Sequence, residues 1–209
     1  MQLRRKSYQA KTAATGICVS LIIYAILILI LSFHATSQID KDSIGDELMD
    51  YLQIKKNFER HGFTTQLFAS KEDARDYLAG ILQNQTIGFG GSETLKEIGL
   101  YEALEKNNVV IWHNKVPGTA VRKLANCCQV YITSANAITK TGEILNIDCT
   151  GNRVAMTAFG PKFCYYIVGK NKITATISEA YSRCKNVAAP LNARRLGVKT
   201  PCAVKPTVS

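Results

Sequence analysis

The sequence contains little histidine and lacks several common catalytic motifs. Its three histidines, His34, His61 and His113, have no partner at the spacing of zinc ligands. There is no Gly-X-Ser-X-Gly motif, and no cysteine is paired with a histidine as a nucleophilic enzyme would require. These absences argue against a zinc site and against the common hydrolases. We therefore expect no metal and no bound cofactor.

Acidic residues are scarce at both ends of the chain. Residues 1–37 contain no Asp or Glu, and Glu179 is the only acidic residue from Arg153 to Ser209, so the formal net charge of +10 lies mainly at the ends. Basic segments attract nucleic acids, anionic membranes or small anions. Neither a basic strand pair interleaved with aromatics nor a zinc-finger spacing is present. We therefore expect no nucleic acid as partner, and predict a small anionic metabolite or nucleotide.

The cysteines show no regular spacing. An odd number without a pattern predicts no disulfide framework, and thiols within apolar runs behave as small hydrophobic groups. We expect them to be reduced and mostly buried, which favours a reducing compartment. The lack of a Cys-X-X-Cys spacing also predicts that the chain holds no iron-sulfur cluster. The seven residues are Cys18, Cys127, Cys128, Cys149, Cys164, Cys184 and Cys202.

A long apolar run lies near the N-terminus. Thr12 to Phe33 contains no charged residue, Ile17 to Leu31 is dense in Ile and Leu, and basic residues precede both. At ~1.5 Å per residue, about 20 helical residues cross a hydrocarbon core of roughly 30 Å. We predict that residues 1–37 form a hydrophobic helix that serves as a membrane anchor or signal segment, with a buried helix as the alternative, and that residues 38–45 are a linker. The protein is then a single-pass membrane protein. Its charges predict an external domain and its cysteines an internal one, so the side of the membrane stays open.

From Asp46 onward, strand-like and helix-like patterns alternate. The pattern predicts strands over 64–68, 86–88, 109–113, 129–133 and 163–168, with a further turn and strand before Asp148. Helices are predicted over 46–61, 71–82, 94–106 with a break at Gly99, 119–126, 153–159 and 178–187. Such alternation is typical of an α/β fold with a mostly parallel sheet and helices on both faces.

The first polar motif is Gly88-Phe89-Gly90-Gly91-Ser92, which follows a predicted strand and opens a helix. Its backbone amides, together with the hydroxyls of Ser92 and Thr94, could bind a phosphate or a carboxylate. The motif matches neither the dinucleotide fingerprint nor the P-loop. A tight strand-to-helix turn without a ligand is the alternative interpretation.

A second polar cluster precedes the helix predicted at 153–159. Arg153 at a helix start opposes the helix dipole, so either a bound anion or a carboxylate such as Asp148 is expected to offset its charge. Lys170 and Lys172 follow a predicted strand, and they either face the same anion or are solvated. The cluster consists of Asn146, Asp148, Thr150, Gly151, Asn152 and Arg153.

The order of these motifs resembles the LUD domain of lactate utilization proteins (the LutC/YkgG-like family). The resemblance is carried by SANAITKTGEILNIDCTGNRVAMTAFGPKFCYYIVGKNK from Ser134 to Lys172, by the Gly88 to Ser92 motif, and by Ala188 to Ala193 and Thr200 to Cys202. It implies that residues 46–209 form a LUD domain with a fold like that of the NagB/RpiA/CoA-transferase superfold. It further implies an accessory subunit in the oxidation of L-lactate to pyruvate, with an iron-sulfur oxidoreductase subunit as a possible partner.

Two further functions stay open at the level of sequence. Sugar-phosphate isomerases of the superfold have an acidic residue where this chain has Asn136, which cannot act as a general acid or base. Glu93, Glu143 and Asp148 are weak candidates for the catalytic base of a stand-alone CoA-transferase-like or isomerase-like enzyme, and the third possibility is a non-catalytic ligand sensor. LUD sequences typically have glycine at Cys149, where a positive φ would strain a cysteine. The predicted ligand-binding residues are Gly90, Gly91, Ser92, Thr94, Asn136, Asp148, Thr150, Gly151, Asn152, Arg153 and Lys172.

Overall fold

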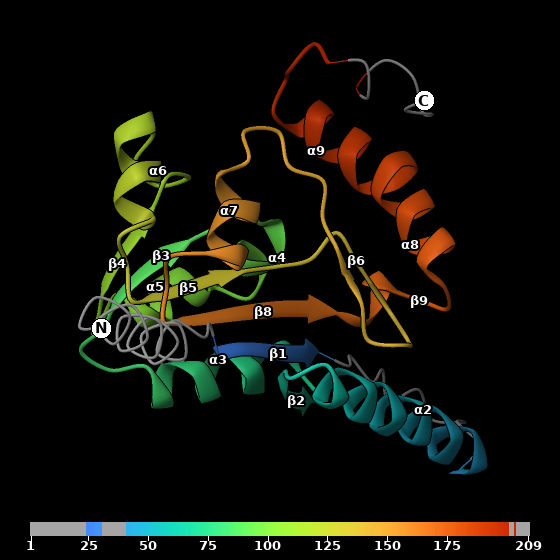
Figure 1. The fold of residues 1–209 in the computed structure, drawn as a ribbon. Coiled ribbons are helices and arrows are strands. Elements are labelled where there is room, and N and C mark those ends of the chain that lie inside the picture. Colours follow the sequence, from blue (N-terminus) through green and yellow to red (C-terminus); the bar gives the residue numbers. More distant parts are fainter. Residues whose placement is uncertain (1–23, 31–40, 201–202, 204–209) are drawn as a thin grey trace, which may run out of the picture.

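A computed structural model describes residues 24–30, 41–200 and 203 (Figure 1). Its main element is a six-stranded sheet in the order β2-β1-β8-β5-β3-β4. Every neighbouring pair in this sheet is parallel, so the predicted mostly parallel α/β sheet is confirmed. The strands are β1 (Tyr24–Ile30), β2 (Thr64–Phe68), β3 (Thr86–Phe89), β4 (Val109–Trp112), β5 (Val130–Thr133) and β8 (Phe163–Gly169).

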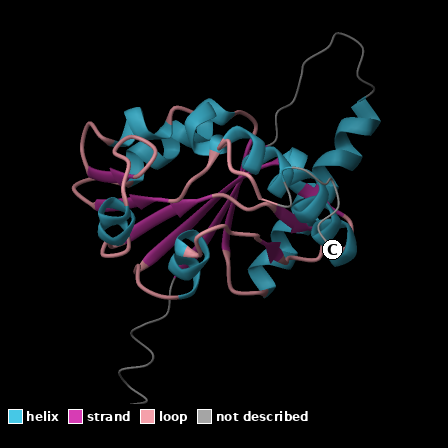
Figure 2. Ribbon diagram, turned by 90° about the horizontal axis from the view of Figure 1, so that it is seen from above, coloured by secondary structure: helices cyan, strands magenta, loops and turns pink. Residues whose placement is uncertain are grey.

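Helices pack on both faces of this sheet, as Figure 2 shows. On one face, α3, α4 and α5 bury residues such as Leu78, Leu95 and Leu104 against Ile87 and Ile132. On the other face, α2 and α7 bury Phe58 and Met156 against the sheet. The helices are α2 (Lys41–Arg60), α3 (Lys71–Ile81), α4 (Glu93–Glu97), α5 (Leu100–Leu104), α6 (Thr119–Ala125), α7 (Asn152–Ala158), α8 (Ile177–Arg183) and α9 (Ala189–Arg195).

Strand β1 corrects the prediction of an N-terminal hydrophobic helix. Residues 24–30 of the apolar run form a strand that pairs in parallel with β2 on one side and with β8 on the other. Leu27, Ile28, Leu29 and Ile30 are all buried. A strand inside a parallel sheet is covered on both faces, so its sequence is a continuous apolar run and cannot be distinguished from a short membrane helix by composition. Residues 17–23 and 31 of the run lie outside the described residues.

No helix in the described part of the chain is long and apolar enough to cross a membrane.

A small second sheet extends the main one at its carboxyl edge. Its order is β7-β6-β9, with β6 (Ala137–Thr139) antiparallel to β7 (Ile144–Leu145) and parallel to β9 (Ile173–Thr174). Ala137 in this sheet packs on Ala180 and Cys184, which belong to α8 and to the π-helical turn η2 (Cys184–Ala188) that continues into α9. The small sheet thus ties the last helices to the end of the main sheet where the candidate site lies.

Local sequence signals explain several helix boundaries. Ser70 accepts a hydrogen bond from the backbone N–H of Asp73 at the start of α3, as its N-cap position predicts. Gly99 has a φ of 65° and separates α4 from α5, which confirms the predicted break. The sequence did not indicate α9, β9 or strand β1.

Candidate functional site

The carboxyl ends of four parallel strands bring the predicted polar segments to one edge of the sheet (Figure 1). Gly90 to Ser92 follow β3, His113 follows β4, Ser134 follows β5, and Lys172 closes the 3-10 turn η1 (Lys170–Lys172) after β8. In open α/β sheets, ligands bind at this edge. The fold therefore assembles the candidate site from segments that are distant in the sequence.

The loop of residues 90–92 after β3, called the glycine loop below, is held close to the neighbouring strand β5. Gly90 donates from its backbone N–H to the carbonyl of Ile132 at 2.9 Å, and its own carbonyl accepts from the indole N–H of Trp112 at 3.2 Å. A Cβ atom at Gly90 would lie 2.7 Å from Thr133 Oγ1 and 3.1 Å from the Tyr131 hydroxyl. Packing alone thus requires glycine at this position, and Ser92 caps α4 by accepting from the N–H of Leu95 at 3.4 Å.

Lys172 lies between the glycine-loop helix and the end of β5. Its half-buried Nζ donates to Thr94 Oγ1 at 2.7 Å and to Ser134 Oγ at 2.8 Å. No carboxylate among the described residues forms an ion pair with it. Burial, and then the positive charge of Arg183, lowers the pKa of Lys172 to about 8. An ammonium group normally has three donors, so one donor remains after the two hydroxyl contacts.

Arg153 is buried in a different way, because protein acceptors occupy its donors. The residue is 8% exposed. Nη1 donates to the carbonyl of Ser134 at 3.0 Å and to Asn146 Oδ1 at 2.5 Å. Nη2 donates to Asn136 Oδ1 at 3.0 Å and to the carbonyl of Ile147 at 2.9 Å. The guanidinium therefore links the residues just after β5 to the loop between β7 and α7.

Asp148 begins helix α7, since its carboxylate accepts from the backbone N–H groups of Arg153 at 2.9 Å and Val154 at 3.1 Å. Its other oxygen lies 3.9 Å from Arg153 Nε, so the predicted carboxylate partner of Arg153 is present. Thr150 Oγ1 donates to Asn152 Oδ1 in the same loop. Gly151 has a φ of 78°, a conformation that favours glycine.

Ser134 joins these two groups. Its carbonyl accepts from Arg153 and its hydroxyl accepts from Lys172. Sequence reasoning did not assign Ser134 or Arg183 to the site, although the position of Ser134 just after β5 was a usable signal. Arg183 donates to the carbonyl of Asn136 and lies in the helix predicted over 178–187, for which no site role was predicted. The structure thus brings all the predicted ligand-binding segments to one edge, and their binding role stays a prediction.

Comparison with family models assigns the chain to a family. A model of the LUD domain matches residues 51–206. The chain belongs to the LUD domain family. This family is linked to lactate utilization in general. Comparisons with curated proteins and with solved structures gave no match.

Two of the three weak carboxylate candidates, Glu93 and Glu143, bind other side chains of the LUD domain. Glu93 forms an ion pair with Arg195 at 2.8 Å, and both side chains are part-exposed. Glu143 lies in the turn between β6 and β7, where it accepts from the hydroxyls of Thr139 and Thr141. These hydrogen bonds lower the pKa of Glu143, which makes it a weaker base. Neither carboxylate contacts Lys172.

The described cysteines of the LUD domain are free thiols. Cys128, Cys164 and Cys184 are buried, whereas Cys127 and Cys149 are exposed. Burial raises the pKa of the Cys164 thiol to about 12. Cys149 does not have a positive φ, because Asn84 is the only described non-glycine residue that does, so the cysteine causes no such strain. In the part of the chain that the structure describes, no three His, Cys, Asp or Glu side chains could hold a metal ion.

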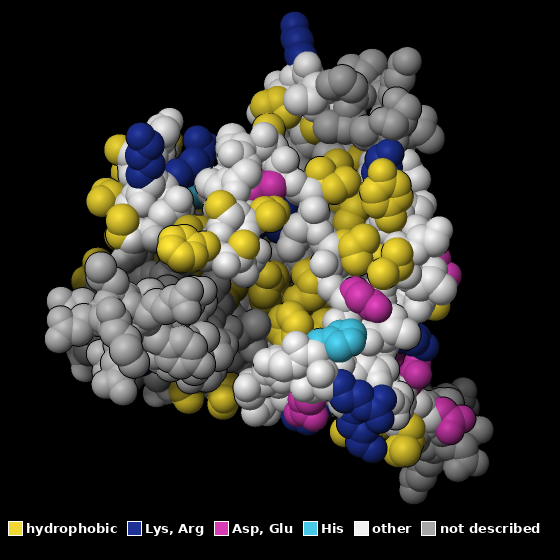
Figure 3. Space-filling model, in the orientation of Figure 1, with side chains coloured by type: hydrophobic (Ala, Val, Ile, Leu, Met, Phe, Trp, Pro, Cys, Tyr) yellow, Lys and Arg dark blue, Asp and Glu magenta, His cyan; other side chains and the backbone are white. Residues whose placement is uncertain are grey.

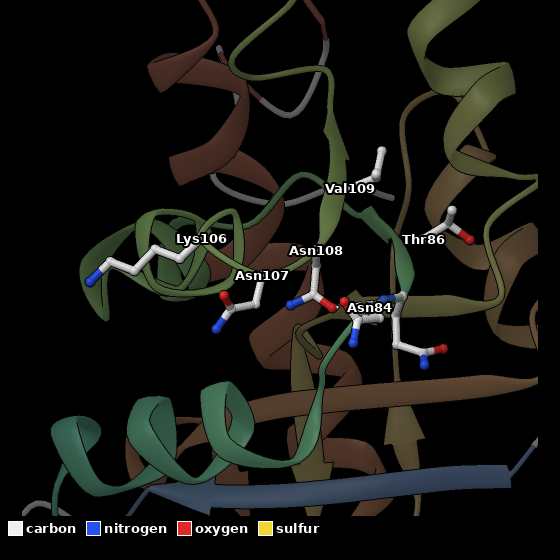
Figure 4. Close-up of a pocket in the computed structure, with 7 residues that line it drawn as sticks. Asn84, Thr86, Lys106, Asn107, Asn108 and Val109 are labelled. Atoms are coloured by element: carbon white, nitrogen blue, oxygen red, sulfur yellow. Dashed lines mark hydrogen bonds between the residues drawn. The ribbon is translucent and has the colours of Figure 1, made fainter.

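A pocket of about 460 Å³ lies at the opposite edge of the sheet, at the amino ends of β3 and β4 (Figure 4). Asn108 connects its walls, since its side chain donates to the carbonyls of Leu82 and Leu104 and accepts from the N–H of Gln85. The side-chain amide of Asn108 thus joins the connection between α3 and β3 to the connection between α5 and β4. The other residues lining this pocket are Asn84, Thr86, Lys106, Asn107 and Val109.

Proposed function

We propose that this LUD domain binds a small anionic metabolite or nucleotide at the carboxyl edge of its sheet, with Lys172 as the cationic contact. The observation that carries the proposal is the half-buried ammonium of Lys172, which is held by two hydroxyls and by no carboxylate of the described chain. Burying a charge without a counter-charge is costly. A bound anion would remove that cost.

The electrostatic surroundings of Lys172 support this proposal. Arg183 and Arg153 lower its pKa and Glu97 raises it, after the larger effect of burial. With a pKa of about 8, Lys172 is mostly protonated at neutral pH. The positive charges around it are therefore in excess, and they favour a ligand with at least one negative charge.

The glycine loop supplies the polar wall on the other side. Thr94, which contacts Lys172, lies in the first turn of α4, directly after Gly90, Gly91 and Ser92. The loop backbone and the hydroxyl groups can donate to the oxygens of a carboxylate or a phosphate. Lys172 and this loop thus form opposite sides of one anion-binding region.

Within lactate utilization, the proposed role is that of an accessory subunit in the oxidation of L-lactate to pyruvate. Membership of the LUD domain family supports the pathway, while the subunit role rests on resemblance and implies an iron-sulfur oxidoreductase partner. We expect the isolated chain to form no pyruvate from L-lactate with an artificial electron acceptor. Pyruvate formation by the isolated chain would contradict the accessory role and leave the anion site untouched.

Calorimetry on the full chain tests the anion site. The probes are L-lactate, pyruvate and AMP, and the variant is Lys172→Met, which removes the charge but keeps an apolar chain of similar length. We expect the affinity for at least one probe to fall about tenfold or more, because a charge-assisted hydrogen bond is lost. Lys96→Met is the matched control, since Lys96 is an exposed lysine of α4. Equal affinities in both variants, or no binding by the native chain, would overturn the proposal.

A further inference from the structure

A second group of polar side chains surrounds the glycine loop on the side of α6. The Arg122 side chain forms no hydrogen bond and no ion pair within the described residues, and its Nε is buried without a partner. His113 Nδ1 and the Tyr131 hydroxyl are also buried and unpartnered. Buried polar groups are nearly always hydrogen-bonded. Three such atoms, one on β5, one just after β4 and one on α6, therefore require an explanation.

Two of these side chains, His113 and Tyr131, lie beside the glycine loop. A Cβ atom at Gly91 would lie 3.2 Å from His113 Nε2, and one at Gly90 would lie 3.1 Å from the Tyr131 hydroxyl. Tyr131 is only 1% exposed, so solvent does not satisfy its hydroxyl. Because both loop residues are glycines, no side chain separates the loop from His113 and Tyr131.

Helix α6 brings Arg122 to this place. Its last residue, Ala125, packs against β3, where a Cβ at Gly88 would lie 2.4 Å from the Ala125 carbonyl. Figure 3 shows basic side chains gathered over α6, and Arg122 and Lys123 are the basic residues of its last turn. His113 follows β4, against which α6 packs. Burial, and then the charge of Arg122, lowers the pKa of His113, while Asp148 opposes this effect.

We propose that Arg122, His113 and Tyr131 form a second anion-binding subsite on the α6 side of the glycine loop. The ligand then carries two anionic groups, one at Lys172 and the other at Arg122. This inference rests on the proposed function, because Lys172 marks the first subsite. Lys172 reaches the end of this loop at Thr94, and His113 and Tyr131 lie beside it at Gly91 and Gly90, so one molecule along the loop can contact both groups.

The experiment compares monoanionic and dianionic probes on the full chain at constant ionic strength. Calorimetry is performed with acetate and with the dicarboxylates succinate, glutarate and adipate. We expect at least one dicarboxylate to bind about tenfold or more tightly than acetate, and Arg122→Gln to abolish this difference. Lys123→Gln, which removes the same charge from the same helical turn, is expected to preserve it.

Tyr131→Phe provides a second variant that keeps the core packed. If the hydroxyl awaits a ligand, its removal leaves the unfolding midpoint in urea unchanged or raised, since an unpartnered buried group is lost. The preference for the dicarboxylate is expected to fall several-fold.

The outcomes separate this inference from the proposed function. If none of these probes binds, and L-lactate, pyruvate and AMP also fail to bind, the proposed anion site itself is wrong. If one of the latter binds but no carboxylate probe does, the second subsite is wrong. If acetate binds but no dicarboxylate binds more tightly, the second subsite is wrong. A preference that survives in Arg122→Gln, or that falls equally in Lys123→Gln, also overturns the subsite while leaving Lys172 as an anion contact.

Discussion

The two polar loops at the carboxyl edge of the sheet differ in what their cations contact. In the first turn of α7, Arg153 donates four hydrogen bonds to protein acceptors and lies beside Asp148 of the preceding loop. In the turn after β8, Lys172 contacts two hydroxyls and forms no ion pair with the described residues. In the sequence, both cations were candidates for contact with the same anion.

This difference shows how to distinguish a structural cation from one available to a ligand. A guanidinium whose two Nη groups donate to protein carbonyl oxygens, and whose Nε lies beside a carboxylate, stabilises the surrounding backbone and offers a ligand little. An ammonium that is buried without a counter-charge keeps both a free donor and an electrostatic need for an anion. The hydrogen bonds of each cation distinguish the structural one from the one available to a ligand, whereas their shared position at the edge of the sheet does not.

The largest expected effect is a loss of stability caused by a charge in strand β1. Ile28 of β1 is fully buried, and β1 pairs with β8, which leads to Lys172. Ile28→Lys is expected to lower the free energy of unfolding by about 4 kcal/mol or more, because a charge enters the core without a partner. Urea denaturation measures it, and Leu48→Lys at an exposed position of α2 is the control. Equal, small losses in the two variants would show that β1 does not belong to the sheet.

Strand β1 also marks the limit of what the sequence predicted about the fold. The remaining main-sheet strands were predicted because turn residues bound their short β-branched and aromatic runs. The segment at residues 24–30 lies in a longer apolar run, which fits a helix across a membrane as well as a buried strand. Only its pairing with Thr64 to Phe68 and with Phe163 to Gly169 decides between them, and pairing is not visible in a single segment.

The next variant tests whether Arg153, in the first turn of α7, contributes to stability or to anion binding. Arg153→Ala leaves the carbonyls of Ser134 and Ile147 without their partner, and we expect a loss of about 3 kcal/mol in the free energy of unfolding. Arg194→Ala, at an exposed position of α9, is expected to change it by less than about 0.5 kcal/mol. If Arg153→Ala retained full stability but lost anion affinity, Arg153 would belong with Lys172 as a ligand contact.

The candidate site was predicted at the level of segments but not of individual contacts. Glycines after one strand and lysines after another indicated a shared edge, because parallel strands end together. The sequence could not show that Asn136 and Asn146 would occupy the donors of Arg153, or that Ser134 would link Arg153 to Lys172. Those contacts depend on the path of the loop between β5 and α7, which no local pattern specifies.

A smaller effect compares glycines from the two loops. Gly90→Ala places a methyl group 2.7 Å from Thr133 Oγ1, so we expect a loss of about 2 kcal/mol from overpacking. Gly151→Ala has open space around the new methyl group but retains a φ of 78°, and we expect about 1 kcal/mol from the left-handed conformation. Urea denaturation of both variants measures the difference. A larger loss for Gly151→Ala would show that the left-handed backbone at Gly151 costs more than the close contact at Gly90.

The last effect is a pH dependence that only the lysine side should show. The pKa of Lys172 is lowered to about 8 by burial and by Arg183, so the cost of its buried charge is present below about pH 8. That cost is relieved as the pH rises from about 8 toward the unfolded value of about 10.4, which raises stability over this window. Anion affinity has the opposite trend, because binding needs the protonated form. We expect the affinity for sulfate, which does not titrate in this range, to be constant below pH 8 and to fall roughly tenfold per pH unit above it. In Lys172→Arg the cation stays charged, so the affinity should remain flat up to pH 10. A decline of the same size in Lys172→Arg would assign the titration to another group and would remove the electrostatic distinction between the two loops.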